Sequence, residues 1–286
     1  MPEPEFRRSQ AILNLNAYSP SEIQEAIERV GVTKVDMPFL SCFMLSVVAG
    51  GSIGFGALYY TIVSSDAELS FAVARLLGGL VFSLGLALVL VGGAELFTGN
   101  NLIVMAWASG RVSMARMLRN WAIVYLGNLV GALGLVVLVV LSRHLEMNNG
   151  RLAQAVIDTA NAKIRPDLVT LFFKGVLCNV LVCMAVWLAY AGRSVTDKIV
   201  GLVLPISAFV AAGFEHCIAN LYFLPLAWVI VHTGAAPATI DVSAITVAGI
   251  VHNLVPVTLG NIVGGAGLVG FVYWAIYRKG LTAGVK

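Results

Sequence analysis

Long uncharged hydrophobic stretches alternate with short charged segments along most of this 286-residue chain. A charged side chain at mid-bilayer costs at least about 2.5–3.5 kcal/mol, so stretches without Asp, Glu, Lys or Arg mark candidate membrane spans. Eight such stretches group into six spans, because the second and the fifth span are each interrupted by one glutamate. The uncharged stretches are 37–65, 76–94, 96–110, 120–142, 175–192, 199–214, 216–240 and 242–277. The pattern predicts an all-α integral membrane protein.

The charged segments divide the chain into three parts. Residues 1–36 form an N-terminal segment, 37–277 the six-span transmembrane domain and 278–286 a short tail. The sequence Ser-Pro-Ser-Glu at 19–22 has the spacing of a helix capping box with proline at the first helical position, and apolar residues then recur at helical spacing. We therefore expect an amphipathic helix before the first span, either as an interfacial anchor or as a cover over a pore mouth.

Composition and charge indicate the class of protein and its orientation in the membrane. Hydrophobic residues make up 59% of the chain and charged residues 12%, about half of the charged fraction in a soluble domain. The net charge of +3 includes no basic tract, so nucleic-acid binding is not expected. The charged start of the chain does not resemble a cleaved signal peptide. Because Lys and Arg concentrate on the side that holds both ends, the positive-inside rule predicts cytoplasmic termini.

Two motifs occur twice, in the same order. Each copy spans three predicted helices, about 37–142 and 168–277, and an odd number of spans requires that the second copy insert upside down. The chain is therefore expected to be an inverted repeat, as in many transport proteins. The matching residues are Gly93, Glu95 and Asn100 with Gly213, Glu215 and Asn220, and Asn120, Gly127, Asn128 and Gly131 with Asn253, Gly260, Asn261 and Gly264.

The glutamate motifs predict breaks in the second and fifth spans. Gly, Thr and Asn around Glu95 and Glu215 disfavour a continuous helix, and unwound backbone at membrane depth is tolerated only where it is buried in protein or lines a cavity. Two half-helices would then meet a central path from opposite sides, each with free N–H groups and the positive end of its dipole. That arrangement suits a small anion.

Individual residues in the breaks carry the candidate chemistry. His216 is the ionisable group there that titrates near neutrality, although it could simply bond a backbone carbonyl. Thr98 can donate its hydroxyl to an oxyanion or can cap a half-helix. Glu95 and Glu215 would repel an anion, so we expect their carboxylates to turn away from the path and accept N–H bonds that fix the break. We expect Asn128 and Asn261 to bridge helices or broken backbone.

Residues near the breaks add electrostatic and steric functions. Lys34 and Lys174 lie near opposite ends of the membrane region and could concentrate anions. The glycines of the repeated motifs favour close helix packing. No residue pattern indicates a metal site, a bound cofactor or an enzyme active site. The candidate apolar constrictions are Phe82, Leu86, Leu96, Phe97 and Phe209.

Four segments of the chain closely resemble the formate/nitrite transporter family: GAELFTGNNLIV (93–104), NWAIVYLGNLVGA (120–132), GFEHCIANLYFLP (213–225) and HNLVPVTLGNIVGG (252–265). The resemblance implies an aquaporin-like protomer in a homopentamer of the bacterial inner membrane, surrounded by lipid, with one pore per protomer. It implies passage of small weak-acid anions such as formate, nitrite or hydrosulfide.

The resemblance also assigns residue roles. It implies that His216 is the central histidine and Thr98 the threonine of the flexible loop. It implies pore asparagines at Asn179 and Asn261, a vestibule lysine at Lys34, and the five constriction residues named above. Formate is the expected substrate, by passive or proton-coupled transport, with protonation of the anion by His216 or by water as one route.

Three alternatives remain open. The FFKG stretch around Lys174 is similar to nitrite-type members, so nitrite or hydrosulfide could replace formate. A neutral-solute pore would also use half-helices that meet at the centre. A redox or haem subunit would need His216 and His252 as axial ligands.

Overall fold

The structure is a computed structural model that describes residues 16–278 apart from 235 and 237–239. Every regular element in these residues is a helix. The N-terminal part of the predicted leading segment and the predicted tail after residue 278 lie outside the described residues. Six helices are long and apolar enough to cross a membrane, which confirms the predicted number of spans. These helices are Phe39–Ser64, Phe71–Gly92, Met114–Leu141, Leu168–Ala191, Val195–Ala212 and Val247–Tyr277.

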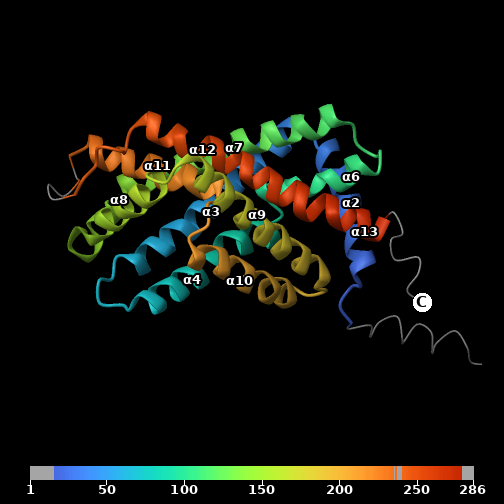
Figure 1. Cartoon of the computed structure of the whole chain (residues 1–286), viewed down its shortest axis with the longest axis horizontal. Coiled ribbons are helices and arrows are strands. Elements are labelled where there is room, and N and C mark those ends of the chain that lie inside the picture. Colours follow the sequence, from blue (N-terminus) through green and yellow to red (C-terminus); the bar gives the residue numbers. More distant parts are fainter. Residues whose placement is uncertain (1–15, 235, 237–239, 279–286) are drawn as a thin grey trace, which may run out of the picture.

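The elements form two series of the same plan. The first comprises α2 (Pro20–Asp36), α3 (Phe39–Ser64), α4 (Phe71–Gly92), α5 (Phe97–Asn100), η1 (Asn101–Ile103), α6 (Val104–Ala108) and α7 (Met114–Leu141). The second comprises η2 (His144–Gly150), α8 (Arg151–Ile164), α9 (Leu168–Ala191), α10 (Val195–Ala212), α11 (Cys217–His232), α12 (Val247–Ile262), η3 (Val263–Phe271) and α13 (Val272–Arg278). Helices α2 and α13 lie at one end of the molecule, and α8 lies at the other (Figure 1). This opposition agrees with the predicted inversion of the second repeat.

Helix α8 extends the repeat beyond what the sequence motifs indicated. Residues 143–167 fall between the two predicted repeats, and the structure contains a 14-residue helix there, whose apolar side is buried. Lys163 stands five residues before α9, as Lys34 stands five residues before α3. Each repeat therefore begins with an amphipathic helix that carries a lysine in its last turn.

Both predicted breaks are present. Helices α4 and α10 end at Gly93 and Gly213, each with φ of 73°, the left-handed conformation that glycine adopts without strain. Four residues later a new helix begins, at Phe97 or at Cys217. The break in the first repeat does not divide its span evenly, because α4 has 22 residues and is itself long enough to cross the bilayer.

Glycine spacing permits the close helix contacts that surround the breaks. A methyl group on Gly131 of α7 would overlap the carbonyl oxygen of Val47 on α3. In the second repeat, a methyl group on Gly264 would overlap the carbonyl of Val176 on α9. These contacts confirm the packing role predicted for the repeated glycines.

The last span contains a wide turn that the first repeat lacks. Residues of η3 form a π-helix, whereas the equivalent part of α7 is regular α-helix. After this segment, α13 packs beside α2, and the indole Nε1–H of Trp274 donates to Ser109 Oγ at 2.8 Å. The wide turn therefore sets which side of the final helix faces the rest of the protein.

Candidate functional site

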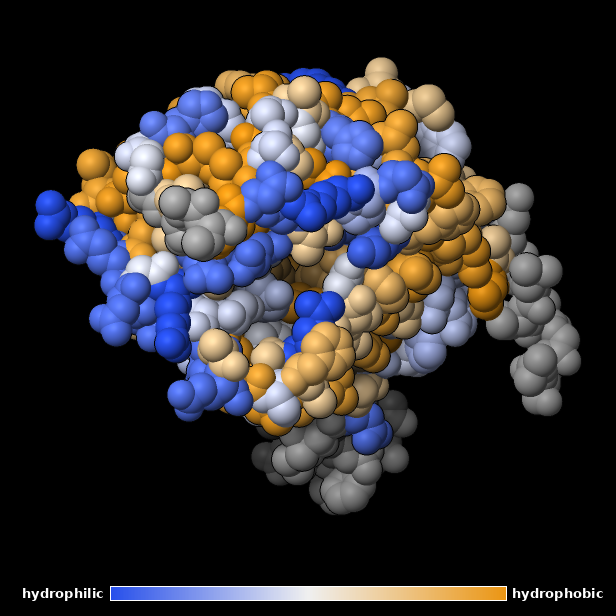
Figure 2. Space-filling view, turned by 60° about the vertical axis from the view of Figure 1, so that its left-hand side comes forward, coloured by the Kyte–Doolittle hydropathy of each residue, from blue (hydrophilic) through white to orange (hydrophobic). Residues whose placement is uncertain are grey.

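Two cavities enter the protein from opposite ends. The first, named here the α8 cavity, has a volume of about 150 Å³ and is lined by Lys163, Lys174, Glu215 and His216, among others. The second, the α2 cavity, has a volume of about 50 Å³ and is lined by Lys34, Leu86, Leu96 and neighbouring residues of α2. Figure 2, which brings the α8 side forward, shows hydrophilic residues around a hollow, with hydrophobic residues on the flanks.

A thin apolar seal separates the cavities. The rings of Phe82 and Phe209 meet edge to face, with 5.6 Å between centroids, at the inner end of the α8 cavity. Leu86 lies one turn further along α4 and lines the α2 cavity with Leu96. One helical turn corresponds to about 6 Å along the axis, so an ion that crosses the seal loses its water over a short distance.

Phe97 does not line either cavity. Its ring packs edge-on against Tyr125 and Trp121 of α7, with centroid distances of 5.0 and 6.3 Å. The structure thus brings four of the five expected constriction residues to the seal. Phe97 lies behind the break because the backbone there directs this side chain toward α7.

His216 and Thr98 meet at the centre of the molecule. His216 Nε2 lies 3.1 Å from Thr98 Oγ1, and both residues are buried. The backbone N–H of Ala219 donates to His216 Nδ1 at 3.1 Å, so this nitrogen carries no proton. The neutral imidazole therefore holds its proton on Nε2 and donates it to Thr98, which leaves the threonine hydroxyl hydrogen free to point at another acceptor.

Glu95 anchors the break of the first repeat. Its carboxylate accepts from Lys34 Nζ at 2.6 Å and from Asn100 Nδ2 at 2.7 Å. Lys34 Nζ also donates to Asn100 Oδ1 at 2.9 Å, and Asn120 Nδ2 donates to the Lys34 carbonyl at 3.2 Å. The carboxylate is held by side chains, which supports the expectation that it fixes the break, although the donors are not the backbone groups that we expected.

Glu215 anchors the second break through equivalent partners. It accepts from Lys163 Nζ at 3.2 Å and from the amide nitrogens of Asn220 at 2.7 Å and Asn253 at 3.3 Å. Lys163 does not reach the amide oxygen of Asn220, which has no hydrogen-bond partner among the described residues. This is the largest difference between the two otherwise matching clusters.

Two asparagines fix the start of the second half of each broken span. Asn128 Oδ1 accepts from the Phe97 N–H at 3.0 Å, and its amide donates to the carbonyls of Ser46 and Glu95. Asn261 does the same for the Cys217 N–H at 2.9 Å and for the carbonyls of Gly175 and Glu215. The predicted bridging role is confirmed, and some N–H groups expected to face an anion are occupied by these side chains.

Asn179 lies beside the first break, outside both cavities. Its amide donates to Asn101 Oδ1 at 2.8 Å, to the Asn261 carbonyl at 2.7 Å and to the Thr98 carbonyl at 3.3 Å. It therefore orients the backbone that carries Thr98. The structure gives it a positioning function next to the path.

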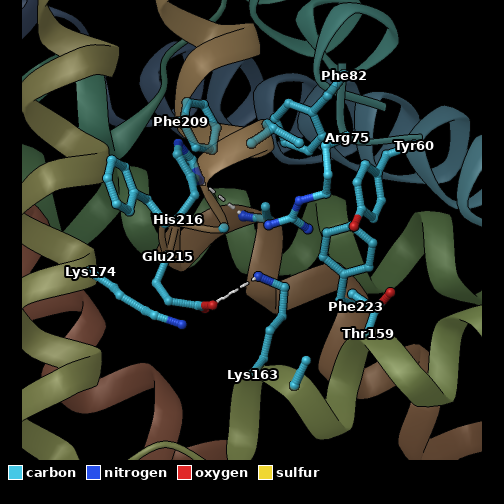
Figure 3. Close-up of a pocket in the computed structure, with 15 residues that line it drawn as sticks. Tyr60, Arg75, Phe82, Thr159, Lys163, Lys174, Phe209, Glu215, His216 and Phe223 are labelled. Carbon is cyan, nitrogen blue, oxygen red and sulfur yellow. Dashed lines mark hydrogen bonds and ion pairs between the residues drawn. The ribbon is translucent and has the colours of Figure 1, made fainter. Parts of the chain in front are cut away.

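Two cations of the α8 cavity were not predicted from the sequence. No role was predicted for Lys163, although its position before α9 matches that of Lys34 before α3 and could have indicated one. Arg75 had no assigned role, because its place near the start of a span gave no indication that it reaches the second break. Figure 3 shows both side chains with Lys174 around the same cavity.

The structure does not favour a haem site at the histidines. Both ring nitrogens of His216 are engaged, and His252 Nε2 lies 3.0 Å from the Pro166 carbonyl oxygen. Within the described residues, no group of three His, Cys, Asp or Glu side chains could hold a metal ion.

The inverted repeat with paired cavities and a central seal defines a membrane channel or transporter. The family description "Formate/nitrite transporter" matches residues 21–275, and the chain belongs to that family. It is 42% identical to the formate channel FocA of Escherichia coli K12 over 271 residues, which cover 91% of this chain and 94% of that protein. It is 39% identical to FocA of Haemophilus influenzae over 276 residues, which cover 93% and 95% of the two chains.

Solved structures agree with this assignment. A pentameric formate channel with formate bound matches with a TM-score of 0.77 and 41% identity, over 84% of this chain and 98% of that chain. An ion channel of the same family matches with a TM-score of 0.77 and 30% identity, over 88% and 98%. The relatives are channels, in line with the expectation that the chain is not an enzyme.

Proposed function

We propose that this protein conducts formate across the bacterial inner membrane as a homopentamer with one pore per protomer. The observation that carries the proposal is the bonded pair of His216 and Thr98 at a one-turn apolar seal between two lysine-lined cavities. The similarity to formate channels along nearly the whole chain supports formate as the substrate.

The uneven distribution of Lys and Arg supports an orientation with both termini in the cytoplasm. The α8 cavity then opens to the periplasm, and the exposed apolar sides of α4, α7 and α10 face lipid or a neighbouring protomer. Protease treatment of intact spheroplasts tests the orientation: a tag on either terminus should be cleaved only after the membrane is opened.

Anions collect in the cavities and meet the seal at His216 and Thr98. Lys174 lowers the electrostatic cost of entry on the α8 side, while Glu95 and Glu215 balance Lys34 and Lys163 and hold them in place. The anion replaces the mutual bond of the central pair and accepts from the imidazole Nε2–H and the threonine hydroxyl. These two donors compensate part of the hydration that the anion loses.

Protonation gives the anion an easier route through the seal. A neutral acid avoids most of the cost of a charge in an apolar environment, which amounts to tens of kcal/mol for an isolated ion. A second proton on the imidazole would place Nδ1–H against the Ala219 N–H, so double protonation requires that this helix cap open. We therefore propose that proton-coupled transport of formate proceeds through brief protonation of His216 or of water beside it.

Uptake by proteoliposomes tests the proposed function. Formate, nitrite and hydrosulfide are compared at equal concentrations under several imposed pH gradients. Fast formate uptake that increases with an inward proton gradient is the expected result. Preference for nitrite or hydrosulfide would change the substrate, and absence of anion flux together with passage of a neutral solute would refute anion transport.

Replacement of His216 by Asn tests the proton step. Asparagine is a good N-cap and can still accept from the Ala219 N–H, so the variant should assemble normally. It has no titratable group, and the acid-stimulated part of formate flux should fall at least about tenfold. The measurement is initial uptake from pH 5 to pH 8.

Thr98→Ser is the matched control for His216→Asn. It keeps the hydroxyl that bonds His216 and should retain the pH profile of the original protein. An unchanged pH profile in His216→Asn would refute the role of the histidine in proton transfer.

A further inference from the structure

We propose that Arg75 and Lys174 form an anion subsite in the α8 cavity that favours anions with two oxygen atoms over spherical anions. The inference rests on anion transport as proposed above and adds a selectivity step at one mouth of the pore. It starts from two cations whose charges the protein leaves uncompensated.

Arg75 is fixed in place by the second break. It comes from α4, and its Nε–H donates to the carbonyl oxygen of Ala211 in the last turn of α10 at 2.8 Å. The guanidinium also lies directly beside Gly213, where an added methyl group would come within 2.6 Å of Nη2. One of five guanidinium N–H donors is thus used on the backbone, and the group is held at the lining of the cavity (Figure 3).

The charges around the α8 cavity do not balance. Arg75, Lys163 and Lys174 line it, and Glu215 is the carboxylate in its lining. Glu215 forms its ion pair with Lys163. Among the described residues, neither Arg75 nor Lys174 has a carboxylate partner, so two positive charges remain.

Arg75 and Lys174 are half-buried near one end of the membrane region. Proteins normally pair such cations or use them on a transport path. The rest of the described lining is neutral, including His216 with its single ring proton and the phenol of Tyr60. A mobile anion is therefore the missing partner. The α2 cavity differs, because its Lys34 is balanced by Glu95 at 2.6 Å.

The geometry of the two cations gives the subsite its selectivity. A guanidinium presents parallel N–H groups that match the two oxygens of a carboxylate or of nitrite, whereas an ammonium acts as a point charge. Hydrosulfide offers one acceptor atom and cannot use the second N–H. Arg75 should therefore favour formate and nitrite, while Lys174 should attract any of these anions.

The subsite belongs to one mouth only. The position equivalent to Arg75 in the second repeat lies 120 residues later, by the spacing of Gly93 and Gly213, and is Val195. The α2 side thus lacks an arginine at the matching place.

The test compares Arg75→Lys with the unchanged protein in proteoliposomes. The lysine keeps the charge and removes the parallel N–H pair. The formate concentration that gives half-maximal uptake should rise about tenfold. The corresponding hydrosulfide concentration should change less than twofold. Equal changes for both anions, or no change for either, would overturn the subsite.

Two further variants keep the test decisive. Lys174→Gln alters no hydrogen bond to the backbone of the break. It should raise the concentrations of formate and of hydrosulfide that give half-maximal uptake, both by about threefold. Unchanged concentrations would count against the subsite even if Arg75→Lys fails to assemble. Arg151→Lys, exposed at the start of α8 outside the cavity, is the matched control and should change neither value. If the unchanged protein takes up no formate, the proposed function fails; if it does and Arg75→Lys keeps its selectivity, only the subsite fails.

Discussion

The two breaks share one backbone and differ in chemistry. Leu96 and His216 occupy the same position before the second helix of each break, with φ of −109° in both and ψ of 125° and 113°. Each break is held by a glutamate, a lysine and three asparagines in equivalent places. Yet the first position carries an apolar side chain that seals, and the second carries an imidazole that donates a hydrogen bond.

The difference shows which parts of the repeat hold the shape and which act on the substrate. The bonds of Asn128 and Asn261 are the same in both halves, so they serve the scaffold. His216 and Arg75 have no equal in the first half, so they are the parts available for function.

The largest expected effect tests the shared scaffold. Asn128→Ala and Asn261→Ala each remove the partner of two backbone groups in the break, an N–H and a carbonyl, which should cost about 2–6 kcal/mol. The two losses should agree, because the bonds match. Thermal unfolding of the purified assembly measures both. A difference of more than about 1 kcal/mol between the variants would show that the breaks are not equivalent supports.

A smaller effect should separate the two lysines. Lys34→Met leaves Glu95 with one amide donor and removes the donor to Asn100 Oδ1, for an expected loss of about 3 kcal/mol. Lys163→Met should cost about 1 kcal/mol less, because Glu215 keeps the amides of Asn220 and Asn253. The same unfolding assay applies. A greater loss of stability for Lys163→Met would show that Lys163, and not Lys34, makes the larger contribution to the fold.

The smallest effect concerns two matching helix starts on the side of the termini. Ser19 begins α2 and Ser194 begins α10, each in a capping box with a carboxylate three residues later. The hydrogen bonds from Ser19 lower the pKa of Glu22 below its usual value. A carboxylate with a lowered pKa stabilises the fold above its usual pKa and loses that contribution as the pH falls through the lowered value.

Ser19→Ala and Ser194→Ala should therefore speed amide exchange in the first turn of their helices by no more than about tenfold near neutral pH. The gap between Ser19→Ala and the unchanged protein should narrow in acid, because the bond from Ser19 Oγ to the Glu22 carboxylate weakens while the bond from the Glu22 N–H to Ser19 Oγ remains. Hydrogen exchange read by mass spectrometry measures it. A gap of unchanged size in acid would show that the Glu22 carboxylate takes no part in the cap.

The spans, the inversion and both breaks could be predicted from the sequence, because bilayer insertion imposes long uncharged stretches and because the motifs repeat at fixed spacing. His216, Thr98 and four constriction residues were also predicted, and the structure places them together. Their motifs lie within a few residues of the breaks, where local spacing sets position.

Contacts across the fold could not be predicted in the same way. Arg75 reaches Ala211, 136 residues later, and nothing local to either residue indicates the bond. Helix α8 was missed because its charged residues were assigned to a loop, although its apolar residues recur at helical spacing. Phe97 turns toward Tyr125 because the packing of α7 decides its direction.

The π-helical segment of the last span determines which side of α13 faces the rest of the protein. A wide turn acts like one residue inserted into an α-helix, and one residue rotates the remainder of the helix by about 100°. In the first repeat, α7 keeps its phase and continues toward α8. In the second, the shifted phase brings Trp274 to Ser109 and lets α13 pack beside α2. Deletion of a single residue between 263 and 271 would thus misdirect the final helix without touching the pore.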